Sequence, residues 1–267
     1  MIKPYYETEL GKLYHGDCLE IMPELEPVDL VLTDPPYGVT GCKWDSVIPL
    51  DLMWKNIMQI IKAEGAIVMT AGQPFTTTLI SSNIKNFKYC WVWDKVKPSG
   101  FQIVKYRPLM RHEDVVVFGS SKTTYNPEMV KRRKSVSGHP SSRSESNPLT
   151  NYDGKLRYYS EKGPQSILIF AKGTDGKYVH PTQKPVALMG YLIKTYTNEG
   201  EIVLDFCIGS GTTAIACEQL NRRWIGIEIE EKYCEIAAKR IEKEVRRPSF
   251  SKMKRKEVKR FKLSELP

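Results

Sequence analysis

Short apolar runs alternate with segments of helical periodicity along most of this 267-residue chain. Strands are predicted at the apolar runs, which lie at 13–14, 28–33, 66–69, 89–93, 115–118, 166–170, 202–204 and 224–229. Helices are predicted at 49–62, with Gly65 as the stop, and at 75–84, 185–197, 212–220 and from 230 onward. Because strands that alternate with helices usually run in one direction, the pattern predicts an α/β fold with a doubly wound, mostly parallel sheet.

One long segment interrupts this alternation. From 120 to 164 the chain is rich in Ser, Asn, Pro, Lys and Arg, with scattered tyrosines and no periodicity. A stretch of this length without secondary structure is usually functional or disordered. We therefore predict an irregular insertion between two halves of the α/β unit.

The positive charge is concentrated in two segments. The whole chain carries +9, but residues 239–262 hold twelve Lys/Arg against three Asp/Glu, and residues 119–166 hold nine against four. The remainder is therefore mildly acidic. Basic segments on an acidic body predict a polyanion partner, most simply nucleic acid, although a solvated loop and tail would have the same composition.

The composition argues against several other classes of protein. No apolar run approaches the ~18 residues of a membrane span, and the N-terminus lacks the apolar core of a signal peptide. The six cysteines form no C-x-x-C pair, and His112-Glu113-Asp114 has no second cluster of metal ligands, so we interpret it as structural. We expect a soluble, reduced protein without a metal or a membrane partner.

Four acidic residues follow predicted strands, namely Asp17, Asp34, Asp205 and Glu228. Each alone has a simple alternative role as a helix N-cap. If the strands are parallel, however, all four lie at the same edge of the sheet, where open α/β sheets bind ligands. The sequence therefore predicts a ligand site at this edge.

The loop after the strand at 202–204 reads Asp205-Phe206-Cys207-Ile208-Gly209-Ser210-Gly211-Thr212-Thr213. Gly209 and Gly211 permit a tight turn and close approach of the backbone to a ligand. Ala214 replaces the third glycine of a dinucleotide loop, and the Gly-Lys pair of a P-loop is absent. Glu228 lies 23 residues after Asp205, where a ribose-binding acid is expected. These features favour an adenosine-containing ligand without a pyrophosphate.

The strand at 28–33 runs directly into Asp34-Pro35-Pro36-Tyr37. The two prolines end the strand and stiffen the turn. The Asp34 carboxylate and a proline carbonyl can accept two hydrogen bonds, and Tyr37 offers a stacking face. The turn therefore suits a planar ligand with an amino group, while a rigid turn with a surface tyrosine remains the alternative.

Three motifs now carry a family resemblance. Asp34-Pro35-Pro36-Tyr37 resembles the catalytic motif of DNA amino-methyltransferases that modify adenine N6 or cytosine N4. The loop at 205–213 resembles their S-adenosylmethionine loop, with Phe206-Cys207 where a proline is usual, and His180-Pro181-Thr182-Gln183-Lys184-Pro185 resembles the motif before it. The catalytic motif precedes the cofactor loop, as in the circularly permuted β class. The resemblance implies a Rossmann-like methyltransferase fold in a cytoplasmic enzyme of a bacterium, archaeon or phage.

The resemblance also implies a mechanism. Asp34 and the Pro35 carbonyl would accept the two amino hydrogens of a flipped-out base, Pro36 would keep the turn rigid, and Tyr37 would stack on the base. S-adenosylmethionine would be the methyl donor and S-adenosylhomocysteine the product. Asp before Pro-Pro-Tyr favours adenine N6 over cytosine N4. An RNA or protein amide methyltransferase and a non-catalytic DNA-binding module are the remaining alternatives.

Site residues are implied in the same way. The cofactor would contact Phe206, Gly209, Ser210, Gly211 and Thr212. Glu228 would bind its ribose, Asp17 its adenine region, and Thr182 and Lys184 its methionine end. Asp205 would bind the cofactor amine or orient the loop. Double-stranded DNA would contact the insertion through Lys131, Arg132, Arg133, Lys134 and Arg143.

The implied organisation has four parts. Residues 1–119 form the catalytic half, 120–165 the target-recognition insertion, 166–242 the cofactor-binding half, and 243–267 a basic tail. The resemblance leaves a homodimer and a cognate restriction endonuclease open as partners, and it does not give the recognition sequence.

Overall fold

The computed structural model describes residues 2–38, 46–138, 155–172 and 183–246. The strands in these residues are β1 (Tyr6–Glu7), β2 (Gly11–His15), β3 (Val28–Thr33), β4 (Ile61–Ala71), β5 (Phe87–Ser99), β6 (Met110–Gly119), β7 (Val130–Gly138), β8 (Arg157–Lys162), β9 (Ile167–Ile169), β10 (Ile202–Asp205) and β11 (Arg223–Glu228). The helices are α1 (Cys18–Ile21), α2 (Leu50–Ile60), α3 (Phe75–Ser82), α4 (Val186–Tyr196), α5 (Thr212–Leu220) and α6 (Glu231–Val245), with short turns η1 (Met22–Glu24), η2 (Ile84–Asn86) and η3 (Phe101–Ile103).

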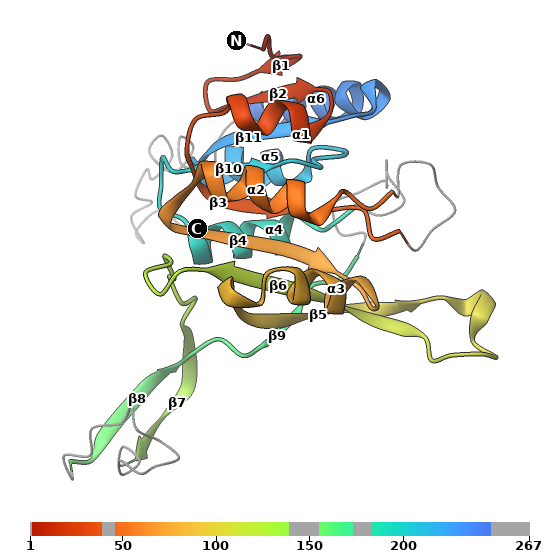
Figure 1. Ribbon diagram of the computed structural model, residues 1–267. Helices are drawn as coiled ribbons and strands as arrows, with labels where there is room; N and C mark the ends of the chain where they lie inside the picture. Colours follow the sequence, from red (N-terminus) through yellow and green to blue (C-terminus); the bar gives the residue numbers. More distant parts are fainter. Residues whose placement is uncertain (1, 39–45, 139–154, 173–182, 247–267) are drawn as a thin grey trace, which may run out of the picture.

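Nine strands of the described chain form one twisted sheet in the order β1-β2-β11-β10-β3-β4-β6-β5-β9 (Figure 1). From β2 to β4 every neighbouring pair is parallel. β6 is inserted antiparallel between β4 and β5. The prediction of a doubly wound, mostly parallel α/β sheet is confirmed.

The winding of the sheet reverses between the neighbouring strands β3 and β10. From β3 the chain continues to β4 on one side, and from β10 it continues to β11 on the other. Loops that follow two such strands diverge, which leaves a crevice at their carboxyl ends. The motif that begins at Asp34 follows β3 and the glycine loop follows β10, so both open into this crevice.

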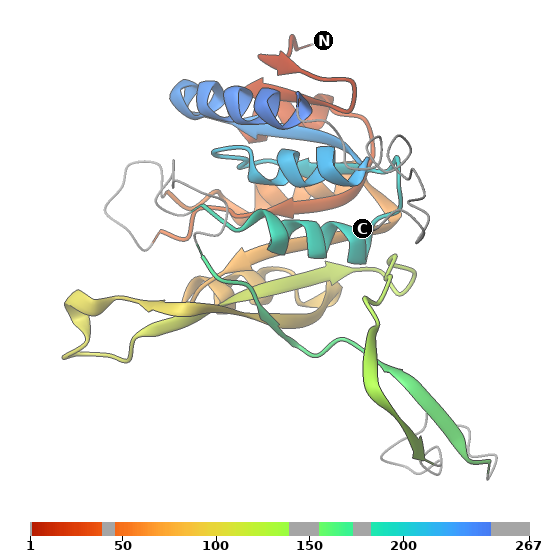
Figure 2. The ribbon, with the colours of Figure 1, turned by 180° about the vertical axis from the view of Figure 1, so that it is seen from behind.

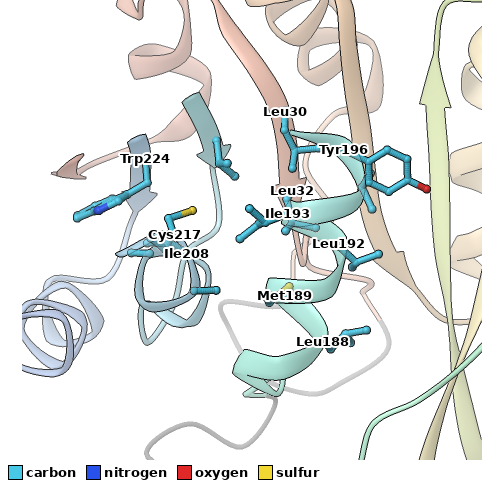
Figure 3. Packing of buried hydrophobic residues seen from close by; sticks show 14 of the residues in the cluster. Leu30, Leu32, Leu188, Met189, Leu192, Ile193, Tyr196, Ile208, Cys217 and Trp224 are labelled. Carbon is cyan, nitrogen blue, oxygen red and sulfur yellow. The ribbon is translucent and has the colours of Figure 1, made fainter. Parts of the chain in front are cut away.

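Helices cover both faces of the sheet (Figures 1 and 2). On one face, side chains of α4 that include Leu188 and Leu192 pack toward Leu30 and Leu32 of β3 (Figure 3). On the other face, α1, α2 and α3 pack over Val31 of the same strand and its neighbours. β3 is therefore buried on both sides, which explains its continuous apolar sequence. No helix in the described ranges has the length and apolarity needed to cross a bilayer.

Most predicted elements are present, and β3 and α5 have the predicted bounds. The helix predicted to run to 62 instead ends at Ile60, and β4 begins at once with Ile61. Gly65 lies inside β4 rather than at a helix stop, and a Cβ there would lie 2.5 Å from Ile61 Cδ1. Close packing, and not a turn, accounts for this glycine.

The insertion is only partly irregular. β7 and β8 pair antiparallel as a two-stranded ribbon, which corrects the prediction of an irregular segment. Nearly all of its side chains are exposed, so no apolar alternation marks the strands in the sequence. The ribbon is reached from the amino-terminal edge of the parallel strands, where Asn126 bonds to the carbonyls of Thr195 and Thr197 at the end of α4.

We expect Gly11→Ala to destabilise the fold. A Cβ at Gly11 would lie 2.2 Å from Cδ2 of the buried Trp224 ring, whose Nε1–H donates to Glu218 at 2.8 Å. Moving this ring should cost about 1–3 kcal/mol of unfolding free energy in urea denaturation. Gly163→Ala is the control, since nothing lies within 4 Å of a Cβ there. Equal stability of the two variants would contradict this packing.

Candidate active site

A cavity of about 480 Å³ opens at the carboxyl ends of the parallel strands. Its lining includes all four acids predicted to meet at this edge, namely Asp17, Asp34, Asp205 and Glu228. The volume lies within the range of small-molecule sites. The geometry therefore brings the turn after β3 and the loop after β10 into one cavity.

Asp34 is held by three donors. Its Oδ1 accepts from the Tyr37 hydroxyl at 2.7 Å and from the Thr70 hydroxyl, and its Oδ2 accepts from Lys184 Nζ. Its side chain is 23% exposed, so one side of the carboxylate still faces the cavity. These contacts fix the carboxylate and supply the positive charge that an acid in a partly buried position requires.

Tyr37 has a fixed position beside this carboxylate. Its ring stacks on Phe75 with centroids 5.3 Å apart and planes inclined by 19°. Burial, followed by the negative charge of Asp34, raises the pKa of Tyr37 well above its usual value. The phenol therefore stays protonated and donates to Asp34. The tyrosine is part of the cavity wall and not a surface residue of a stiff turn.

Lys184 is almost fully buried, at 6% exposure, and lies between two acids. Besides its bond to Asp34, its Nζ is 3.5 Å from Glu113 Oε2. Burial lowers the pKa of Lys184, but the charges of Asp34 and Glu113 outweigh burial, so the pKa is raised. The ammonium group is therefore kept charged where it touches Asp34.

Glu113 is the centre of a cluster that the sequence did not reveal. Its Oε1 lies 3.2 Å from Lys95 Nζ and 3.3 Å from Lys172 Nζ. Burial raises its pKa, but the three lysines, Lys184 foremost, outweigh this and lower the pKa to about 2. The sequence predicts a structural role for Glu113, because His112-Glu113-Asp114 has no second cluster of metal ligands. The structure places it in the cavity wall, and the described residues contain no cluster able to hold a metal ion.

The loop after β10 is organised by Asp205. Its Oδ1 accepts from the Thr33 hydroxyl at 2.8 Å and from the Cys207 N–H at 3.1 Å, and its Oδ2 accepts from Thr213 at 2.6 Å. Burial raises its pKa to about 6, although these donors oppose the shift. Asp205 thus links β3 to both ends of the loop. Two roles were predicted for it, binding the cofactor amine and orienting the loop, and these contacts support the second.

The backbone of the loop depends on its glycines. Gly209 and Gly211 have φ of 53° and 82°, a left-handed region that side chains disfavour. The Gly209 N–H donates to Glu228 Oε2 at 2.9 Å, and the Glu230 N–H donates to Oε1 at 2.9 Å. Burial is the main cause that raises the pKa of Glu228. Both carboxylate oxygens are therefore aligned at the cavity edge by backbone donors.

The predicted cofactor residues are mostly brought together. The cavity is lined by Asp17, Lys184, Phe206, Gly209, Ser210 and Thr212. Asp17 also caps α1 through the Leu19 N–H at 2.8 Å. Gly211 is not in the lining; a Cβ there would lie 3.1 Å from Ala237 Cβ, so it faces α6. Lys184, predicted at the methionine end of the cofactor, contacts the Asp34 carboxylate. Thr182 lies outside the described residues.

The predicted DNA-binding residues lie elsewhere. Lys131, Arg132, Arg133 and Lys134 are exposed on β7, at the edge of the sheet opposite the cavity (Figure 1). Arg143 lies outside the described residues. The structure therefore does not bring the basic cluster of the insertion next to Asp34.

A parallel sheet with an acid directly after β3 and a glycine loop after β10 is the arrangement expected of an S-adenosylmethionine-dependent methyltransferase. A DNA methylase family model for N6 and N4 enzymes matches residues 28–239. The chain is 26% identical over 250 residues to the type II methyltransferase M.HpaI of Haemophilus parainfluenzae, covering 87% of this chain and 74% of that protein. It is 27% identical to the DNA adenine methyltransferase YhdJ of Escherichia coli, covering 89% and 84%.

Solved structures agree with this assignment. The M1.HpyAVI–SAM complex has a TM-score of 0.60 at 25% identity, covering 87% of this chain and 99% of that one. The cytosine-N4-specific PvuII methyltransferase shares the fold, with a TM-score of 0.64 at 18% identity and coverage of 91% and 94%. The chain belongs to the N6/N4 DNA methylase family, as the motifs predicted. It is a DNA methyltransferase that uses S-adenosylmethionine.

We expect Glu113→Gln to remove a pH-dependent stabilisation. Because the pKa of Glu113 falls from 4.5 to about 2 on folding, its charge stabilises the native state above pH 4.5. That contribution is about 3 kcal/mol at pH 7 and is lost as the pH falls from 4.5 toward 2.

Urea denaturation of the wild type and Glu113→Gln at pH 7, 5 and 4 tests this expectation. The difference in unfolding free energy between the wild type and Glu113→Gln should be nearly constant between pH 7 and 5 and smaller at pH 4. Glu199→Gln, at an exposed position, is the control and should change little. A pH-independent difference would contradict the proposed charge balance.

Proposed function

We propose that this enzyme methylates the N6 amino group of an adenine flipped out of double-stranded DNA. The observation that carries the proposal is the position of the Asp34 carboxylate, in the same cavity as the loop 205–213. Asp34 and the Pro35 carbonyl would accept the two amino hydrogens. The nitrogen lone pair, otherwise delocalised into the ring, would then be directed at the methyl group.

Lys184 has a defined part in this proposal. Its Nζ donates a hydrogen bond to Asp34 Oδ2, which is one of the acceptors that the amino group of the base would need. When the base enters, Lys184 can give up this bond without losing its counterion, because Glu113 lies 3.5 Å from the same ammonium. The cost of desolvating an unpaired lysine is thereby avoided. Glu113 would act as a positioning residue that lets the lysine exchange one carboxylate for the other.

Tyr37 would receive the flipped base. One face of its ring is covered by Phe75, and Lys184 Nζ lies over the ring 5.9 Å from its centroid, so a base would stack on the face turned away from Phe75. Its hydroxyl bond to Asp34 fixes the ring relative to the carboxylate. Stacking on an aromatic side chain is worth about 1–3 kcal/mol per base, which offsets part of the cost of unpairing.

S-adenosylmethionine supplies the transferable methyl group and fits the chemistry of the cavity. Its sulfonium charge is complemented by the acids at the strand ends, which include Asp34 and Asp205. Glu228 would accept from the ribose hydroxyls, since each of its oxygens has a second lone pair beyond its backbone bond. Phe206, Gly209, Ser210 and Thr212 would line the adenosine side, with Asp17 at the adenine and Lys184 toward the methionine.

Adenine is favoured over cytosine by the residue that precedes Pro35. Asp34 resembles the motif of adenine enzymes, whereas Ser is usual in cytosine-N4 enzymes. Relatives of both kinds match this chain, since YhdJ is named an adenine methyltransferase and the PvuII enzyme is cytosine-N4-specific. Cytosine N4 is therefore the second candidate, because the same two acceptors serve its amino group.

The remaining expectations stay predictions. Phosphate binding by the basic residues of β7 and by the tail is suggested by their charge, and a cognate restriction endonuclease by the name type II methyltransferase that relatives carry. The homodimer follows only from the resemblance to the β class. The four-part organisation is likewise a proposal, although β3 of the first half and β10 of the second are neighbours in one sheet.

The product of the reaction tests the proposal directly. The protein is incubated with methyl-labelled S-adenosylmethionine and unmethylated genomic DNA, which is then digested to nucleosides and analysed by mass spectrometry. We expect N6-methyladenine at defined sites. N4-methylcytosine instead would overturn the choice of base.

The role of Asp34 has its own test. Asp34→Ala should lower the rate by at least about 100-fold, because the amino group loses its charged acceptor. The affinity for S-adenosylmethionine, measured by calorimetry, should fall far less than the rate, because Asp205 and Glu228 still line the cavity. Asp51→Ala, an exposed acid on α2, is the control. A rate near that of the wild type in Asp34→Ala would show that this carboxylate is not catalytic.

A further inference from the structure

β5 and β6 extend beyond the sheet as a two-stranded ribbon. β6 pairs with β4 only from Asp114 onward, and β9 pairs with β5 only up to Asp94. Farther out, β5 and β6 pair only with each other, as at Ser99 and Met110. The ribbon and its turn therefore protrude from the domain, as the yellow segment in Figures 1 and 2 shows.

The ribbon protrudes at the edge of the sheet that holds the cavity. Thr33 at the end of β3 is level with Met69 of β4, and Ala71 at the end of β4 is level with Asp114 of β6. Beyond that level, Glu113 at the base of the ribbon lines the same cavity as Asp34. The tip is thus joined to the wall of the active site.

The tip carries positive charge and exposed aromatic rings. From 95 to 111 there are five Lys/Arg and no Asp/Glu. Lys97, Lys105 and Arg107 are exposed and form no ion pair with any residue that the structure describes. Phe101 is 65% exposed and Tyr106 is 87% exposed. Exposed cations next to unburied rings suit a ligand that has both phosphates and aromatic faces.

The base of the ribbon is held in place. Arg111 donates to both carboxylate oxygens of Asp94, at 2.8 and 2.9 Å, and thus ties the two strands together. The Val96 N–H donates to the other side of Asp94 Oδ1 at 2.8 Å, and Val96 has a φ of 65°, which is rare for a β-branched residue. The hydrogen bond of the Val96 N–H to Asp94 accompanies this left-handed backbone conformation.

We propose that the β5–β6 tip, residues 96–110, binds duplex DNA beside the target base. Lys97, Lys105 and Arg107 would contact phosphates, and Phe101 and Tyr106 would contact bases. A two-stranded ribbon fits the major groove of B-DNA, about 12 Å wide. The proposal rests on DNA methylation, which the family establishes, and holds for an adenine or a cytosine target.

The β7–β8 ribbon is placed less favourably for this role. It is reached from the edge opposite Asp34, through Asn126 at the end of α4. The β5–β6 ribbon, in contrast, protrudes at the edge of the sheet that holds the cavity. The tip therefore takes the position at the target site that the sequence assigned to the insertion.

A second copy of this chain is the competing occupant of the tip. Exposed aromatic residues are also common in interfaces between protein subunits. The tip has no acid to complement its own cations, so two tips would repel each other. Polyanionic DNA removes this repulsion, and we therefore favour it.

Two double variants test the proposal in the full-length protein. Lys105→Ala/Arg107→Ala should weaken binding to a target duplex roughly tenfold and lower the slope of log K against log salt by about 2, one for each phosphate contact. Phe101→Ser/Tyr106→Ser should raise the KM for DNA with kcat within about threefold of wild type and little change in the salt slope. Affinity for S-adenosylmethionine and thermal stability should be unchanged in both.

Lys85→Ala/Lys88→Ala is the matched control, because these exposed lysines lie at the other end of β5. It should bind DNA like the wild type. The proposal would be overturned if both tip variants bound DNA with wild-type affinity. It would also be overturned if Lys131→Ala/Arg133→Ala were the only variant to lose DNA affinity. A change of mass in light scattering, with DNA binding unchanged, would assign the tip to self-association. Because all arms measure binding or total methylation, they remain informative whichever base is modified.

Discussion

The Asp34 carboxylate can serve as an acceptor because three donors, among them a buried lysine, hold it in place. Lys184 lies between Asp34 and Glu113, and both acids raise its pKa against the effect of burial. Two further lysines balance Glu113, so the cavity wall holds a network of charges rather than one pair. In such a network Lys184 can exchange one carboxylate for the other without becoming an unpaired charge in a buried site.

This network exists because of the reversal in the sheet. β3 and β10 are parallel neighbours whose following loops diverge, and Asp205 connects them through the Thr33 and Thr213 hydroxyls. The turn at Asp34 and the glycine loop are 171 residues apart in sequence yet line one cavity. The antiparallel β6 brings Glu113 to the same edge from the opposite direction.

The sheet class and most of the cavity could be predicted from local patterns. The apolar run of β3, the two prolines and the spacing of Glu228 each have a direct physical meaning. Glu113 could not be found in this way, because its role depends on β6 running antiparallel and on three distant lysines. The β7–β8 ribbon was missed because its exposed strands lack apolar alternation. Long-range charge pairing and solvated strands leave little signal in one sequence.

A crystal structure of the enzyme with target duplex and a non-reactive analogue of S-adenosylmethionine would test the central claim most directly. The quantity to measure is the set of contacts made by Asp34 and Lys184. We predict that the target amino nitrogen lies about 3 Å from an Asp34 oxygen, with Lys184 moved from Asp34 onto Glu113. If Lys184 remains on Asp34 and the base amino group is bound by other residues, the account is wrong.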